Sequence, residues 1–203
     1  CIRRTDAPSI DCLTSLPSQV TWTMARLLAS VGDLNGWRLV MSEASDHGQR
    51  YRPAGDQRPP VTVTEEQIRG SLNRQMVAGV NCFTTYYSYA GLADDQLRRI
   101  NEYIGRCCLM LREPLARAPR IALVYPTESI WTRFVPSRHV TRQAAAAQPI
   151  ADAYADTAEL LYAQARDFTI VDAQALSEAK PRPQGLSHGA LQKLLRTGQV
   201  RID

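Results

Sequence analysis

The segment RLVMSEASDHGQRY, residues 38–51, joins an apolar run to two carboxylates. Arg38–Met41 has the composition of a buried strand, which we expect over residues 37–42, and Glu43 and Asp46 come directly after it. In many α/β enzymes, the polar groups that do the chemistry follow the carboxyl ends of parallel strands. Ordinary loop carboxylates occupy the same position. The sequence on either side must therefore show whether Glu43 and Asp46 belong to a functional site or to an ordinary loop.

Elements on both sides of this segment alternate between strands and helices. The capping box Thr64–Gln67 predicts the start of one helix, and we expect this helix to end at Gly79. Apolar residues at helical spacing predict helices at 17–31, 64–78 and 95–112 and from about Pro149. Short runs rich in apolar and β-branched residues predict strands at 80–89, 121–125 and 168–171. This alternation favours parallel α/β units.

Two prolines, Pro114 and Pro119, interrupt the pattern and suggest a boundary between two domains, residues 1–113 and 114–203. In the second domain, the wholly apolar strands 121–125 and 168–171 are expected side by side in a parallel sheet. Residues 46–60 form a long connection without periodicity, and connections of that length are often functional.

Composition excludes several classes of protein. The 203 residues are 44% hydrophobic, and no apolar run approaches the roughly 20 residues of a membrane span. The net charge of +4 is spread along the chain, which argues against a nucleic-acid partner. The five cysteines and three histidines lack metal-ligand spacing, so we expect reduced thiols, a cytoplasmic protein, and no metal or cofactor. The chain begins without Met, and we expect it to be part of a longer polypeptide.

Carboxylates and aromatic side chains come together at the predicted strand ends. Strand ends of an α/β barrel converge on one face. Carboxylates are the groups that cleave glycosidic bonds, and aromatic faces pack on the apolar faces of sugar rings. The candidate site residues are Asp11, Glu43, Asp46, His47, Tyr86, Tyr87 and Tyr89.

Three stretches resemble, in order, the last third of a clan A glycoside hydrolase (β/α)8 barrel: TDAPSIDCL (5–13), RLVMSEASDHG (38–48) and QMVAGVNCFTTYYSY (75–89). The similarity is to bacterial β-galactosidase-like and α-rhamnosidase-like enzymes. RIALVYPTESIWTRF (120–134) and DFTIVD (167–172) resemble the first two strands of the amidotransferase-like, or flavodoxin-like, α/β domain that follows the barrel in such enzymes. The ordered resemblance covers roughly residues 1–175.

The resemblance implies a hydrolase that cleaves O-glycosidic bonds of plant or bacterial oligo- and polysaccharides. Glu43 would be the carboxylate on the seventh strand, acting as nucleophile or catalytic base. The partner acid/base would lie on the fourth strand, which this sequence does not contain, so we expect this piece to be inactive and unstable alone. Residues 115–203 contain no Cys, so the second domain is expected to serve packing or homo-oligomer contacts.

Simpler interpretations remain for several candidates. Glu43 fits an ordinary loop acid as well, Asp46 fits a loop cap better than a second catalytic acid, and Asp11 fits either a site or a turn. Tyr87 and Tyr89 share one face of their strand, and one face is expected to be core. The alternative function is a non-catalytic α/β ligand-binding or interaction protein of flavodoxin-like fold, in which residues 1–113 pack as part of an open sheet.

Overall fold

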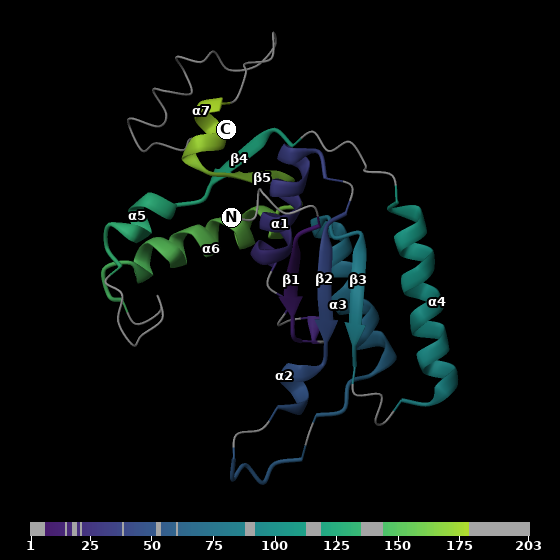
Figure 1. The fold of residues 1–203 in the computed structure, drawn as a ribbon. Coiled ribbons are helices and arrows are strands. Elements are labelled where there is room, and N and C mark those ends of the chain that lie inside the picture. The colour runs from purple at the N-terminus through teal and green to yellow at the C-terminus, as the bar shows by residue number, and fades with distance from the viewer. Residues whose placement is uncertain are drawn as a thin grey trace.

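The computed structural model describes residues 7–14, 16–17, 20, 22–37, 39–51, 54–59, 61–87, 92–112, 119–134 and 144–178. These residues form a mixed α/β fold with two small parallel sheets (Figure 1). In chain order the elements are β1 (Ser9–Cys12), α1 (Trp22–Asn35), β2 (Met41–Ser45), α2 (His47–Arg50), α3 (Glu65–Ala78), β3 (Cys82–Tyr86), α4 (Asp94–Met110), β4 (Ile121–Val124), α5 (Thr127–Trp131), α6 (Gln148–Ala163), β5 (Phe168–Val171) and α7 (Ala173–Glu178).

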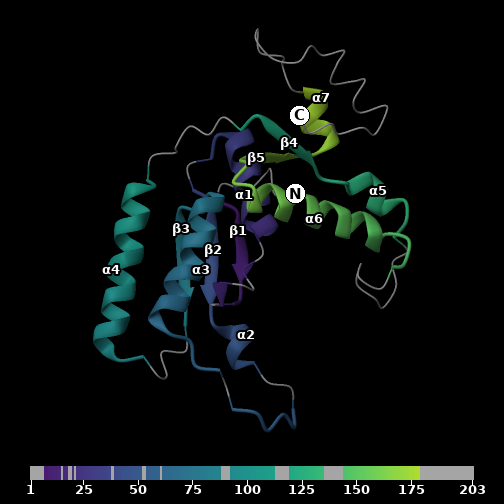
Figure 2. The ribbon, with the colours of Figure 1, turned by 180° about the vertical axis from the view of Figure 1, so that it is seen from behind.

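The larger sheet has the order β1-β2-β3, and both strand pairs are parallel. Right-handed crossovers between strands that follow one another in this way place their helices on one face. Accordingly, α1 contacts α3, and α3 contacts α4. Figures 1 and 2 view the sheet from opposite sides, with α3 behind the strands in the first and in front of them in the second. The other face of the sheet is left to polar and half-exposed side chains.

The strand that carries Glu43 lies further along the chain than the sequence suggested. It was expected at 37–42, but β2 spans Met41–Ser45, so Glu43 is its third residue rather than the residue after its end. The amide of Met41 donates to the carbonyl of Pro8 at 3.1 Å. Proline has no N–H with which to continue the ladder, so pairing with β1 cannot extend toward Arg38.

Several elements lie where the sequence placed them. The capping box of α3 forms as expected, with the Thr64 hydroxyl accepting from the Gln67 amide and the Gln67 side chain accepting from the Thr64 amide. The helix ends at Gly79, whose φ of 118° lies in the left-handed region that favours glycine. The expected strand pair is confirmed too, because β4 and β5 are parallel neighbours.

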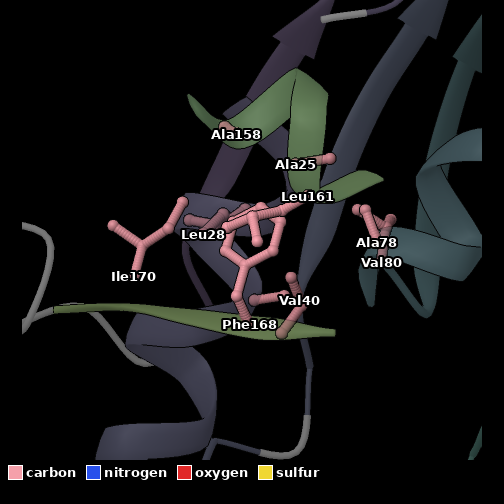
Figure 3. Packing of buried hydrophobic residues seen from close by; sticks show 10 residues of the cluster. Ala25, Leu28, Val40, Ala78, Val80, Ala158, Leu161, Phe168 and Ile170 are labelled. Atoms are coloured by element: carbon pink, nitrogen blue, oxygen red, sulfur yellow. The ribbon is translucent and has the colours of Figure 1, made fainter. Parts of the chain in front are cut away.

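The two-stranded sheet packs on α1 through a shared hydrophobic core. Phe168 and Ile170 of β5 and Leu161 of α6 belong to the same buried cluster as Leu28 of α1 and Val40 before β2. In Figure 3, the Phe168 ring lies among Leu28, Leu161 and Val40. This cluster joins residues on the two sides of the predicted domain boundary at 113/114.

A buried arginine reinforces this junction. Arg26 of α1 donates from Nε to the Phe168 carbonyl (2.6 Å) and from Nη1 to the Ala78 carbonyl (3.2 Å), and its Nη2 pairs with Asp167 at 2.8 Å. One turn further along α1, the Ser30 hydroxyl accepts from the Ile170 amide at 2.9 Å. Through these polar contacts, α1 holds both the end of α3 and the strand β5.

A second cluster lies between the larger sheet and the helices α3 and α4. It contains Ala44 of β2 and Tyr87, which follows β3, packed against residues of these helices and Val63. Its helical members are Ile68, Leu72, Ile100 and Ile104. The helix-covered face of the sheet is therefore largely buried, and the other face carries Asp11, Glu43 and Thr84.

Candidate functional site

Three polar residues form a row across the larger sheet. The register pairs Asp11 with Glu43 and Glu43 with Thr84. Register partners in a parallel sheet lie on the same face, with strands about 4.8 Å apart. Asp11 and Thr84 are exposed, and Glu43 is half-buried. The structure thus places Asp11 and Glu43, two of the candidates from the sequence, side by side.

The neighbours of Glu43 along β2 show which face it occupies. Ser42 donates from its hydroxyl to Oε1 of Gln75 on α3 at 2.5 Å, and Ala44 belongs to the cluster under α3 and α4. Because side chains alternate along a strand, Glu43 lies on the face turned away from these helices. None of the ion pairs between described residues involves Asp11 or Glu43.

The carboxyl ends of β1 and β2 are tied together through α2. The Gly48 amide donates to the carbonyl of Leu13 at 2.6 Å, and the Gln49 side chain donates from Nε2 to the Thr14 hydroxyl at 2.8 Å. A Cβ on Gly48 would lie 2.8 Å from the Leu13 carbonyl oxygen, so a larger residue cannot approach the backbone this closely. Glycine at this position lets α2 sit directly on the end of β1.

Asp46 links β2 to α2. It is buried and is the N-cap residue of α2, but its side chain makes no capping hydrogen bond with that helix. Asp46 thus occupies the position before α2 through its backbone. His47 follows as the first residue of α2, and its amide donates to the Ser45 hydroxyl at 3.2 Å.

The aromatic candidates separate into two environments. Tyr86 pairs in register with Ser45 and is 50% exposed, on the same face as the row of polar residues. Tyr87 is buried in the cluster under α3 and α4, and Tyr89 lies outside the described residues. Tyr51, which sequence reasoning missed, is 61% exposed and stacks on His47 with ring centroids 5.6 Å apart. The spacing of four residues between His47 and Tyr51 could have indicated this contact, since residues four apart are neighbours on a helix.

Cysteine chemistry finds no support at the site. Burial raises the pKa of the Cys12 thiol at the end of β1, and burial also raises the pKa of Cys108 on α4. A raised thiol pKa keeps the sulfur protonated and unreactive. Within the described ranges, no group of three His, Cys, Asp or Glu side chains is arranged to hold a metal ion.

The part of the chain that the structure describes contains no helix with the length and apolarity needed to cross a bilayer. Comparison with family models, curated proteins and solved structures gave no match. What the row of Asp11, Glu43 and Thr84 does must therefore be argued from its own geometry.

Proposed function

We propose that this chain forms part of the catalytic (β/α)8 barrel of a glycoside hydrolase, with Glu43 as its nucleophile or catalytic base. The observation that carries this proposal is the row of Asp11, Glu43 and Thr84 on the sheet face opposite the helices. Successive parallel strands with helices on one face are the repeating unit of a barrel, and the uncovered face then becomes its interior.

The proposed chemistry uses two carboxylates. One carboxyl group protonates the leaving oxygen while the other attacks the anomeric carbon or activates water. Glu43 takes the second role, and the acid comes from a strand outside this sequence. Asp11, one strand spacing away, accepts hydrogen bonds from sugar hydroxyls, and Tyr86 offers a ring and a hydroxyl at the end of β3. The β4–β5 sheet belongs to an amidotransferase-like domain that serves packing.

A second candidate function is a non-catalytic α/β ligand-binding protein. The observation that favours it is the open sheet, because β1 and β3 are its edge strands among the described residues. Under this proposal the same polar face binds a small ligand without breaking a bond. The two functions differ in whether Glu43 contributes to turnover or to affinity alone.

The test is Glu43→Gln in the complete polypeptide, assayed on aryl β-galactosides and aryl α-rhamnosides. Removing the charge while keeping the shape should lower kcat by roughly 10³-fold or more, with an unchanged melting temperature. Glu159→Gln on the exposed side of α6 is the matched control and should keep wild-type turnover. Near wild-type turnover of Glu43→Gln would contradict the catalytic role. Sugar binding without any hydrolysis by the wild type would favour the second candidate.

A further inference from the structure

A partly exposed aromatic pair lies where the chain passes from β2 to α2. His47 is the first residue of α2 and Tyr51 follows its last residue, and their rings are stacked with an interplanar angle of 27°. Figure 1 shows α2 just beyond the ends of β1 and β2, where the chain leaves the sheet. Tyr51 is more than half exposed. A large aromatic ring in solvent gives up packing against apolar neighbours, so its exposure is worth explaining. Stacking covers the face of each ring that meets the other, so the surface offered to a ligand is the exposed part of the Tyr51 ring, at the carboxyl end of the sheet that carries Asp11 and Glu43.

Hydrogen bonds hold this aromatic pair in place. The Tyr51 amide donates to the His47 carbonyl at 2.7 Å, which closes the turn between the two rings. Gln49, between them in sequence, is buried and anchored to Thr14, and its carbonyl accepts from the Val61 amide at 3.4 Å. A stacking surface that is already ordered loses little entropy when a ligand binds.

The sheet that leads into α2 carries the carboxylates Asp11 and Glu43, which accept hydrogen bonds. A neutral polyol suits both parts of the surface. The apolar C–H face of a sugar ring packs on an aromatic ring, and its hydroxyls donate to carboxylate oxygens.

We propose that His47 and Tyr51 form a stacking platform that binds the apolar face of a sugar ring and sets the affinity of the site for carbohydrate. This inference rests on the proposed function, which places the substrate on the sheet that leads into α2. It adds Tyr51 to the site and makes it a specificity-determining residue that touches the sugar without taking part in bond cleavage.

The experiment measures sugar binding and turnover separately in the complete polypeptide. Binding of methyl β-galactopyranoside, methyl α-rhamnopyranoside and cellobiose is measured by saturation-transfer NMR and titration calorimetry. Tyr51→Ala should weaken binding of the preferred sugar roughly five- to tenfold, and Tyr51→Phe should stay within about twofold because the ring remains. On the matching aryl glycoside, Tyr51→Ala should raise KM by a similar factor and leave kcat within about twofold.

The control is Trp131→Ala, which removes another exposed aromatic ring from α5, away from α2 in both views (Figures 1 and 2). It should bind sugar like the wild type. Wild-type affinity in Tyr51→Ala, an equal loss in Trp131→Ala, or no binding of any of the three sugars would each overturn the platform. Weakened binding by Tyr51→Ala in a protein that hydrolyses nothing would support the platform and contradict the hydrolase. Hydrolysis by the wild type, with a KM that is unchanged in Tyr51→Ala, would support the hydrolase and contradict the platform.

Discussion

Arg26 shows how one residue determines the junction between the two sheets. Its side chain is 2% exposed, and its partners are two backbone carbonyls and a carboxylate that is itself 58% exposed. Burying a guanidinium is costly unless its donors are satisfied. One of the acceptors, the Ala78 carbonyl, belongs to the last residue of α3, where the helix dipole favours a cation. The arginine thus completes the end of one helix while binding the start of β5.

Replacing this arginine should destabilise the protein strongly. Arg26→Met keeps much of the apolar stem but leaves the Phe168 and Ala78 carbonyls without their donor, so we expect the free energy of unfolding to fall by about 3 kcal/mol. Asp167→Asn is the matched control and should cost less than about 1 kcal/mol, since its side chain is largely in solvent. Urea denaturation measures both variants. A loss below about 1 kcal/mol in Arg26→Met would show that the junction depends on packing alone.

At the scale of elements, local signals predicted some bounds and missed others. The helix α3 and the strands β4 and β5 lie within one residue of the expected ranges, whereas the helix expected at 17–31 spans Trp22–Asn35. The capping box fixed the start of α3 because its two hydrogen bonds are made within four residues. The start of β2 depends instead on Pro8, more than thirty residues away, and the sequence around Arg38 carries no sign of that pairing. For the same reason, no bounds could be predicted for β1, the four-residue strand before the first helix. Its pairing with β2 also brings Asp11 beside Glu43, a contact that no local pattern contains.

The close approach of α2 to β1 leads to a prediction for Gly48. In Gly48→Ala the new methyl group would press on the Leu13 carbonyl, so α2 must move away from the strand end. We expect a loss of about 2 kcal/mol in stability and weaker sugar binding, because His47 and Tyr51 move with the helix. Gly105→Ala in α4 is the control. Its Cβ meets nothing within 4 Å, and alanine should stabilise the helix by about 0.5–1 kcal/mol. Equal stability of the two variants, measured by thermal unfolding, would contradict the steric argument.

At the scale of the whole molecule, the shared core should couple the two sheets. Phe168 packs with residues of α1 and α6, so Phe168→Ala should cost about 3–5 kcal/mol. The substitution should also loosen the β1-β2-β3 sheet, although Phe168 belongs to the β4-β5 sheet. Hydrogen exchange is the measurement, and β2 amides should lose protection together with those of β5. Two independent unfolding transitions, with β2 unaffected by the substitution, would instead support the separate domains 1–113 and 114–203 that the sequence suggested.

The bond from Arg26 to the Phe168 carbonyl has a consequence for synthesis on the ribosome. Its two residues are 142 positions apart in the chain. At about 5–20 residues per second, α1 emerges roughly 7–28 s before the strand that covers it. During that interval Leu28 and its apolar neighbours lack part of their eventual cover, and the guanidinium lacks its partners Asp167 and the Phe168 carbonyl. The nascent chain therefore passes through a stage at which chaperone binding to α1 competes with aggregation, and slower translation of residues 120–170 lengthens that stage.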